Sequence, residues 1–326
     1  MSAPALKGPY WVTVRQYRRT LWLAVAAVIV SLAVIGGLRI WDAQTPDQLL
    51  QDGYPIPSDE NRGFRALEWA MEYAGGGMIL LPLLVGAFVA GPLIAREFES
   101  GTYKLSLTQS VSPAAWLRAK LLTTTSAVLL ATLALTGVFR IGWERAAIFE
   151  GGAWDPGPYV ATGVVLFAYL LAAVAVGALL GLLIRRTLVA MAATGLVMGV
   201  VLLVLGAYRW SFLPVKTITG PTGPTLWTPE NGLMMDTGLL TASGARFDQS
   251  ICWDEVNRTP GLDGMEDGGT KLFDRCLTRH GATAQYVDYH PSSHYWPTQL
   301  IESGILLALT ALAAFAAFRV LRARLP

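Results

Sequence analysis

Three histidines and an aspartate form the cluster that comes closest to a metal-binding pattern. His280, His290 and His294 follow one another closely, with Asp288 just before His290. The HxxxH spacing of His290 and His294 would place two imidazoles on one helical face, as in many zinc sites. Pro291 lies within the spacer and disfavours a long helix through the pair. We therefore favour surface or interfacial histidines and assign no metal site, with metal ligation as the alternative.

Both cysteines of the chain, Cys252 and Cys276, lie in one polar segment, residues 209–299. Two cysteines close in sequence, on the oxidising side of a membrane and with none elsewhere, favour one disulfide. Such a bond would stabilise the segment by about 3 kcal/mol. Paired free thiols or metal ligands are the alternative.

A nucleotide-binding motif is absent from the sequence. The pattern GxxxxGK[ST] does not occur, and the nearest stretch, residues 268–271, lacks the Gly-Lys-Ser/Thr ending. We therefore expect that this chain is not an enzyme and holds no cofactor of its own.

The composition is typical of a membrane protein. Of 326 residues, 53% are hydrophobic and only 15% are charged, whereas soluble domains carry roughly 25% charged residues. These numbers exclude a soluble globule and a disordered chain, and a net charge of +2 does not favour a nucleic-acid partner. A spanning helix needs about 20 mostly apolar residues. Six stretches qualify: residues 21–40, 78–95, 121–141, 160–184, 187–208 and 300–319.

The distribution of Lys and Arg predicts the orientation of these spans. With both termini inside, the inner segments hold thirteen basic residues against Glu97 and Glu99, a net charge of +11. The remaining twelve basic and twenty-one acidic residues give −9 outside. The sequence therefore predicts an all-α polytopic membrane protein with six transmembrane helices, both termini cytoplasmic, and a mixed extracellular insertion before the last helix.

This topology divides the chain into three parts. Residues 1–208 would hold an N-terminal helix and the first five spans. Residues 209–299 would form an extracellular domain with one disulfide, in which no regular period persists. Residues 300–326 would form the last span and a cytoplasmic tail.

Two details of the first part concern its amphipathic and irregular segments. Tyr10, Val14 and Tyr17 recur at helical spacing, which is typical of an interfacial amphipathic helix or of an ordinary basic flank. The second span contains prolines and glycines and is expected to be short and irregular, after a separate outer helix near 64–71 and a glycine run at 75–77.

Glycines and charges at the other spans also carry predictions. Small-xxx-small spacing predicts close helix packing at four glycines: Gly177, Gly181, Gly195 and Gly199. Arg39, Arg140 and Glu302 lie near outer ends of spans, where we expect their charged heads to reach the interface.

The inner segment between the second and third spans, residues 92–121, has the composition of a docking site. Arg96, Glu97 and Glu99 bring charges of both signs to a helix end, and a Gly-Thr turn follows. A merely solvated turn would not need so much apolar and charged character, so we favour contact with a cytoplasmic protein.

In this segment the chain resembles the ABC-2-type permease subunits of bacterial, particularly actinobacterial, ATP-binding-cassette exporters. The resemblance rests on Ala95-Arg-Glu-Phe-Glu-x-Gly101-Thr102, on Thr108-Gln-Ser-Val-Ser, and on Trp116-Leu-x-Ala-Lys120. Pro113 departs from the family pattern, which often has a basic residue there. The topology extends the resemblance over the whole chain.

The resemblance implies a permease that moves an amphiphilic or hydrophobic substrate (drug, antibiotic, lipid or peptide) outward across the bacterial cytoplasmic membrane. It implies a second permease, identical or a sister subunit, a surrounding of membrane lipid, and two copies of a cytoplasmic ATPase that binds the ATP and magnesium. The assembled complex would then be an ATPase.

The resemblance also assigns roles to individual residues. The inner segment would be a coupling helix that contacts the ATPase through Arg96, Glu97, Glu99, Gly101, Thr102, Tyr103, Lys104 and Gln109. The second and fifth spans would line the substrate path, with Phe88, Met191 and Met198 in its wall. An apolar wall with methionines suits amphiphilic cargo.

Two other classes of function remain as alternatives. A membrane-anchored sensor or partner-binding protein would act through its ectodomain, so its inner loop would be replaceable and no ATPase would copurify. An ectodomain metalloenzyme would depend on the histidine cluster. A proton-coupled carrier is disfavoured, because few ionisable residues lie within the predicted spans.

Overall fold

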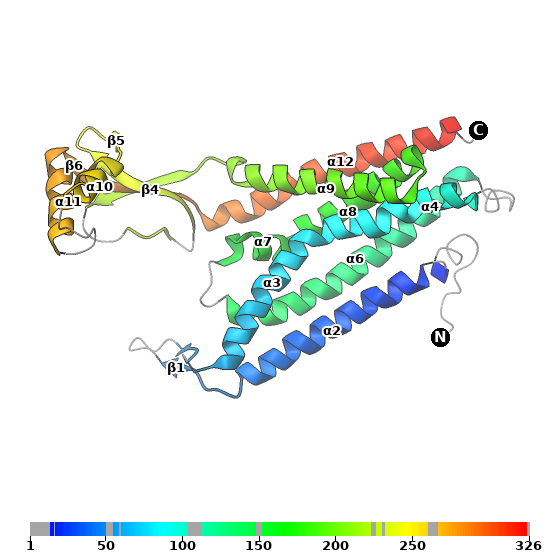
Figure 1. Cartoon of the computed structure of the whole chain (residues 1–326), viewed down its shortest axis with the longest axis horizontal. Helices are drawn as coiled ribbons and strands as arrows, with labels where there is room; N and C mark the ends of the chain where they lie inside the picture. The colour runs from blue at the N-terminus through cyan, green and yellow to red at the C-terminus, as the bar shows by residue number, and fades with distance from the viewer. Residues whose placement is uncertain are drawn as a thin grey trace. The chain divides into compact units, whose positions relative to one another are not determined.

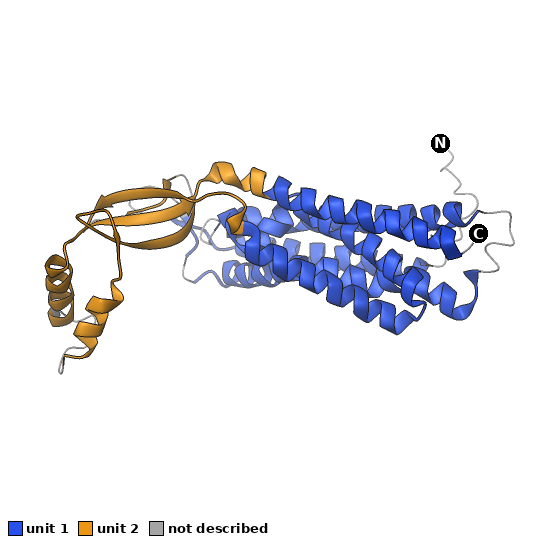
Figure 2. Cartoon of the chain, turned by 90° about the horizontal axis from the view of Figure 1, so that it is seen from above, with its two compact units in different colours: residues 1–209, 299–326 blue, residues 210–298 orange. Residues whose placement is uncertain are grey.

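Six helical segments in the described part of the chain are long and apolar enough to cross a membrane, as the sequence predicted. The computed structural model describes residues 14–15, 17–49, 55–58, 60–103, 112–147, 152–222, 226–229, 232–259 and 267–324. Two compact units are present (Figure 2): unit 1 comprises residues 1–209 and 299–326, and unit 2 comprises residues 210–298.

The six segments pack side by side in unit 1 (Figure 1). They are α2 (Arg18–Asp42), the run α3–η1–α4 (Arg62–Ser100), α6 (Pro113–Ala146), α8 (Val165–Ile184), α9 (Thr187–Tyr208) and α12 (Tyr295–Arg324). At one end of unit 1, the Glu97 end, α4, α8 and α12 finish and α6 and α9 begin. At the opposite end, the Glu302 end, α2, α6 and α9 finish and α3 begins.

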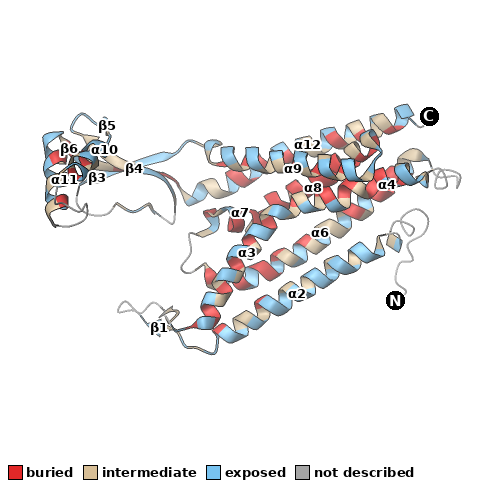
Figure 3. Cartoon of the chain, in the orientation of Figure 1, coloured by how far each residue is buried: buried red, intermediate tan, exposed pale blue. Residues whose placement is uncertain are grey.

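Burial differs sharply among these helices (Figure 3). Helix α8 is buried over most of its length, whereas α2 is exposed on most of its surface. Since both are strongly apolar, α8 is the central helix of unit 1 and α2 is a peripheral one whose apolar surface is expected to face lipid.

The second span is longer than the sequence predicted. It is one helical run consisting of α3 (Arg62–Val85), the π-helix η1 (Gly86–Ala90) and α4 (Gly91–Ser100). The predicted irregularity is confirmed as a π-helix. Pro92 has no N–H to donate to the Phe88 carbonyl, which accounts for a widened turn at this position.

The glycine run at residues 75–77 does not end a separate outer helix, so that prediction was wrong. Gly75 lies inside α3, where a Cβ would lie only 3.1 Å from the Cα of Gly157. The glycine therefore allows two backbones to approach closely. Asn61 begins the helix by accepting a hydrogen bond from the Phe64 N–H at 2.9 Å.

The small-xxx-small glycines of α8 and α9 do pack closely, and their contacts lie on the second span. A Cβ on Gly177 would lie 2.5 Å from the Cβ of Ala90, and one on Gly195 would lie 3.3 Å from the Cβ of Ala87. Gly181 approaches Ala95 in the same way. The glycines of both helices thus allow η1 and α4 to pack closely against α8 and α9.

The fourth predicted span is divided into α7 (Pro156–Thr162), which follows the short η2 (Gly152–Trp154), and α8. The amide of Gln299 fills the break. Its Nε2 donates to the Tyr159 carbonyl at 2.7 Å, and its Oε1 accepts from the Val165 N–H at 3.0 Å. A Cβ on Gly163 would collide with this amide, so glycine is required there.

Glu302 does not reach the interface, contrary to the expectation from sequence. It is completely buried at the Glu302 end and forms a bidentate ion pair with Arg209, with Nε to Oε2 at 2.9 Å and Nη2 to Oε1 at 3.0 Å. Tyr169 and Tyr159 donate hydroxyl hydrogen bonds to the same carboxylate at 2.6 and 3.2 Å. Four hydrogen bonds compensate the dehydration of the charge, which is why it remains inside.

A second charged group closes the connection between α2 and α3 at the same end. The buried Asp42 accepts from Arg145 Nε at 3.0 Å and from Asn61 Nδ2 at 3.1 Å. Arg145 also donates to Asp47, and this hydrogen bond lowers the pKa of the Asp47 carboxyl. The short strands β1 (Gln48–Leu49) and β2 (Pro55–Ile56) pair antiparallel nearby in the chain.

Unit 2 contains a four-stranded antiparallel sheet in the order β3-β6-β4-β5. The strands are β3 (Lys216–Pro221), β4 (Leu233–Thr241), β5 (Arg246–Phe247) and β6 (Ala282–His290), with helices α10 (Ser250–Asn257) and α11 (Asp267–Arg279) between β5 and β6. The pairing of β4 with β6 shifts register twice, which interrupts the alternation of side chains. This is why no period of two was visible in the sequence.

The predicted disulfide is confirmed. Cys252 of α10 and Cys276 of α11 are bonded and completely buried. On β6, the buried Asp288 accepts from the Thr217 hydroxyl and from Arg246 Nη2, each at 2.5 Å. These two donors hold the pKa of Asp288 below its ordinary value.

Candidate functional site

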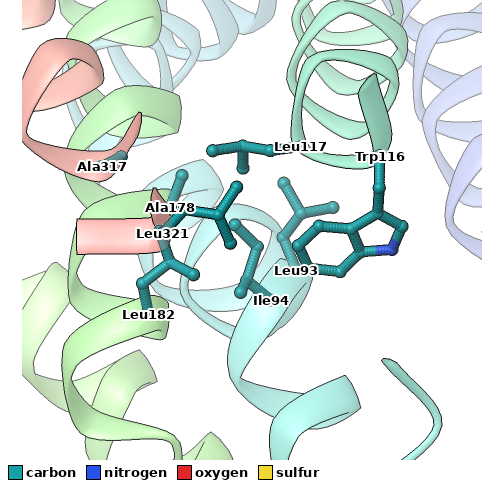
Figure 4. Packing of buried hydrophobic residues seen from close by; sticks show 8 residues of the cluster. All are labelled: Leu93, Ile94, Trp116, Leu117, Ala178, Leu182, Ala317 and Leu321. Carbon is teal, nitrogen blue, oxygen red and sulfur yellow. The ribbon is translucent and has the colours of Figure 1, made fainter. Parts of the chain in front are cut away.

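The Glu97 end of unit 1 contains a continuous apolar cluster that joins four helices (Figure 4). Its buried members are Leu93, Ile94, Trp116, Leu117, Ala178, Leu182, Ala317 and Leu321. They come from α4, α6, α8 and α12, and Tyr17, Phe98 and Tyr103 pack against them. Helix α4 is therefore held by large side chains from several directions where it ends.

A buried ion pair lies beside this cluster. Lys120 Nζ of α6 contacts Glu97 Oε1 of α4 at 2.5 Å, and both side chains are nearly inaccessible. The ammonium also lies 5.6 Å from the ring centre of Tyr17 and 5.4 Å from that of Trp116, which adds cation–π attraction. The Tyr17 hydroxyl donates to the Leu93 carbonyl at 3.0 Å. This group thus fastens α4 to α6 and to the residue preceding α2.

The predicted docking residues divide into a buried and an exposed set. Glu97 is 5% exposed and faces Lys120, so its position excludes direct contact with a protein partner in this conformation. Arg96, Glu99 and Thr102 are exposed. We define these three residues as the exposed docking face.

Glu99 also has a structural contact. Its Oε2 accepts the backbone N–H of Thr187, the first residue of α9, at 2.9 Å. An acidic group at a helix N-terminus satisfies a free N–H and interacts favourably with the helix dipole. The docking face is thereby connected to the fifth span.

The turn after α4 requires a glycine. Gly101 has φ of 73° and caps α4 in the left-handed region, which residues with a Cβ rarely adopt. Just before and after it, the rings of Phe98 and Tyr103 stack at 4.6 Å, and the Arg185 guanidinium lies 5.4 Å from the Phe98 ring centre. Tyr103 is therefore mainly a packing residue, and Lys104 and Gln109 lie outside the described residues.

The three predicted wall residues of the substrate path lie in different environments. Phe88 on the π-helix η1 is 63% exposed, and Met191 of α9 is half-buried. Met198 is completely buried, where a Cβ added to Gly86 would lie 3.1 Å from its Cγ. Phe88 is thus the accessible member of the set, while Met198 packs α9 against η1.

The histidines of unit 2 form a pair rather than a cluster of three. His290 Nδ1 lies 3.1 Å from His294 Nδ1, and His290 Nε2 lies 3.0 Å from the Trp210 carbonyl oxygen. His280 lies with its ring near Phe247. Within the described ranges, no group of three candidate metal ligands comes together. Strand β6 ends at His290 and η5 (Ser292–His294) follows, so the two imidazoles do not share an α-helical face.

Sequence reasoning missed the structural roles of Lys120 and Tyr17. Lys120 lies in a motif that carried the family resemblance, but the partner that neutralises it was not identified. The available signal was a single lysine about two turns into an apolar helix, because such a charge requires a nearby counterion. A glutamate at the end of the preceding span supplies it.

Comparison with known families identifies the chain. A family model described as ABC-2 membrane transporter related matches residues 23–209, which is more than half of the chain. The match includes most of the first span, the next four spans and the Glu97–Lys120 pair. No curated protein matches the chain. Together with six apolar helices, the match indicates a multi-pass membrane protein. The chain therefore belongs to the ABC-2 membrane transporter related family and is an ABC-2-type permease.

Proposed function

We propose that this permease is the membrane subunit of a bacterial ABC exporter and that the exposed docking face contacts a separate cytoplasmic ATPase. Two ATPase subunits and a second permease would complete the transporter, and ATP and magnesium would bind to the ATPase. The cargo would be an amphiphilic or hydrophobic molecule that moves outward. Membership in the ABC-2 family supports an ATPase partner in general terms.

The charges at the two ends of unit 1 support a cytoplasmic location for the Glu97 end. The helix ends that meet there carry many basic residues and few acidic ones: Arg18, Arg19, Arg96, Arg118, Lys120, Arg185, Arg186, Arg319, Arg322 and Arg324 against Glu97 and Glu99. Basic residues concentrate on the cytoplasmic side of membrane proteins. Unit 2 would then be extracellular, where its disulfide would be stable.

The observation that carries the proposal is the rigid attachment of an exposed, charged helix end. Arg96 and Glu99 project from α4, while Leu93, Ile94 and Glu97 on its other sides are buried. A partner that displaces the docking face therefore displaces α4, and the cluster and the Glu97–Lys120 pair transmit the displacement to α6, α8 and α12. This arrangement suits a subunit that is moved by another protein.

The π-helix supports a substrate path along the second span. Widened turns of this kind occur frequently at functional sites. η1 lies between α4, which would receive the displacement, and α3, and it presents Phe88 outward. We propose that η1 changes its winding during transport and that Phe88 contacts the cargo.

Coexpression with an ABC-type ATPase subunit tests the proposal. Arg96→Glu reverses a charge on the docking face, so it should lower copurification of the ATPase by about tenfold or more, as expected for charged interface residues. Arg319→Glu is the matched control, because Arg319 is exposed on α12 and lies outside the docking face. Both variants should insert into the membrane like the original chain and should have the same unfolding temperature.

Two results would contradict the proposal. Equal ATPase recovery with Arg96→Glu and Arg319→Glu would show that the docking face is not the contact. Failure of any ABC-type ATPase to bind the original chain would instead favour a sensor or partner-binding role for unit 2.

A further inference from the structure

His290 and His294 of unit 2 form a hydrogen-bonded pair that the proposed function does not use. The Nδ1 atoms of the two rings lie 3.1 Å apart, and the ring centres are 5.4 Å apart. His290 is 2% exposed, and His294 is half-buried. The second ring nitrogen of His290, Nε2, lies 3.0 Å from the Trp210 carbonyl oxygen. Both nitrogens of His290 are therefore engaged in hydrogen bonds.

The pair joins the two ends of unit 2. Trp210 is the first residue of this unit and lies in the short helix η3 (Arg209–Ser211). His290 ends β6, and His294 lies four residues before Thr298, the last residue of the unit. The chain passes between unit 1 and unit 2 at these two ends. The hydrogen bonds of His290 thus tie the segment that enters unit 2 to the segment that leaves it.

The hydrogen bonds determine which nitrogens of the neutral pair carry protons. A carbonyl oxygen only accepts, so Nε2 of His290 donates to Trp210. Nδ1 of a neutral His290 is then an acceptor, and it receives the Nδ1–H of His294. One additional proton fits on Nε2 of His294 without breaking either bond. A second additional proton has to bind Nδ1 of His290, where two N–H groups would face each other and two positive charges would repel.

Positive charges on the surrounding elements act against this second proton. Lys216 of β3 acts on His294 as a further positive charge. Arg209 of η3 directly precedes Trp210, but its charge is compensated by the carboxylate of Glu302. Lys216 is therefore the positive group that adds to the repulsion within the pair.

The carboxylates on the neighbouring strands already have donors. Asp288, two residues before His290 on β6, accepts from Arg246 and from Thr217. Asp236 of β4, the register partner of Asp288, is exposed and also accepts from Arg246. The first turn of α12 contains no acidic residue. Around the pair, the described acidic side chains thus give little compensation for a second charge.

We propose that His290 and His294 form an acid-sensitive clasp that joins the first and last segments of unit 2. The clasp is closed while at least one of the two imidazoles is neutral, and it opens when both are charged. Because the open form binds one proton more than the closed form, a fall in pH favours opening. The clasp requires neither transport nor an ATPase, so its test is independent of the proposed function.

Hydrogen–deuterium exchange of the full purified chain in detergent tests the clasp. Peptides that cover residues 210–216 and 286–295 are compared at about pH 7.5 and about pH 5, on either side of the ordinary histidine pKa. The rates are corrected for the intrinsic pH dependence of exchange. Below a pKa of about 6.5, one extra proton favours opening tenfold for each pH unit, so exchange should be about 30-fold faster at the lower pH. His294→Gln keeps an N–H donor for His290 but cannot become charged, so its corrected exchange should not depend on pH.

The third histidine of the chain supplies a matched control. His280 is exposed, with its ring near Phe247 and outside the pair, so His280→Gln should keep the full acid response. A second measurement needs no substitution: the ring signals of the three histidines are followed by NMR in the original chain during a pH titration. His290 and His294 should titrate in two separate steps and His280 in one. A chelator added at neutral pH should leave the exchange unchanged, because a proton and not a metal ion joins the rings.

Three outcomes would overturn the proposal. Equal corrected exchange at the two pH values in the original chain, or three histidines that titrate alike, would show that the pair does not respond to acid. An acid response that persists in His294→Gln would assign it to other groups. Faster exchange in the presence of the chelator would identify the two imidazoles as ligands of a metal ion.

Discussion

Unit 1 has a buried ion pair at each end, and the two pairs differ in how completely their carboxylates are satisfied. At the Glu302 end, four hydrogen bonds from Arg209, Tyr159 and Tyr169 occupy both oxygens of Glu302. At the Glu97 end, Lys120 contacts Oε1, while Oε2 of Glu97 has no hydrogen-bond partner among the described residues.

The comparison indicates different roles for the two ends. A bidentate arginine pair with two tyrosine donors is geometrically specific and holds α7, α8, α12 and Arg209, the C-cap of α9, in one arrangement. A lysine–glutamate pair has one contact between an ammonium and a carboxylate oxygen, and its energy depends less on the relative orientation of the two side chains. We infer that the Glu302 end acts as a fixed base, while the Glu97–Lys120 pair keeps α4 joined to α6 when the two helices move together.

Removing the charge of Glu302 should have the largest effect. Glu302→Gln leaves the Arg209 guanidinium buried without its counterion, so we expect a loss of about 3–5 kcal/mol in the free energy of unfolding. Thermal unfolding of the purified chain measures it. The double variant Glu302→Gln with Arg209→Met removes both charges and should recover most of the loss. If the double variant is no more stable than Glu302→Gln alone, the pair is not what holds this end.

The equivalent change at the Glu97 end should cost less. Glu97→Gln leaves Lys120 with the faces of Tyr17 and Trp116, so we expect about 2–3 kcal/mol rather than the full penalty. Adding Lys120→Met should restore stability. ATPase recovery with this double variant then separates folding from coupling, because its docking face is intact. A cost above that of Glu302→Gln would reverse the comparison.

Tyrosine-to-phenylalanine variants test the same comparison by removing one hydrogen bond at each end. Tyr159→Phe removes a donor to a charged carboxylate and should cost about 1.5–3 kcal/mol, whereas Tyr17→Phe removes a neutral bond to the Leu93 carbonyl and should cost about 1 kcal/mol. The same unfolding measurement applies. Equal costs would contradict the difference in hydrogen-bond strength.

A partly exposed arginine should give the smallest effect. Arg39 contacts Asp42 at 2.9 Å, but its side chain is 35% exposed and Asp42 also has Arg145 and Asn61 as partners. Arg39→Gln should therefore cost less than about 0.5 kcal/mol. A loss as large as that of Tyr159→Phe would show that burial does not set the order of these effects.

The helical segments were predictable because each apolar run is long enough to span a membrane. The ion pairs were not, because Arg209 and Glu302 lie in different predicted parts of the chain and Glu97 and Lys120 lie on different spans. The sequence identified a segment with charges of both signs, but it did not reveal which of those charges are buried. Residues 97 and 99 are about 200° apart on α4, so one glutamate is buried and the other exposed.

The contacts of the glycines were likewise not predictable from the sequence. Their spacing predicted close packing, yet only the fold reveals that α8 and α9 enclose η1. Pattern alone also could not distinguish a glycine run that ends a helix from one that accommodates a neighbouring backbone, as at Gly75 and Gly157.

Disulfide cross-linking from the docking face tests the central claim most directly. The two native cysteines are bonded to each other, so a cysteine introduced by Thr102→Cys is the single free thiol of the chain. With a coexpressed ABC-type ATPase carrying surface cysteines, Thr102→Cys should form a cross-linked species, while Ala43→Cys, exposed at the Glu302 end, should not. Cross-linking from Ala43→Cys and not from Thr102→Cys would contradict the account.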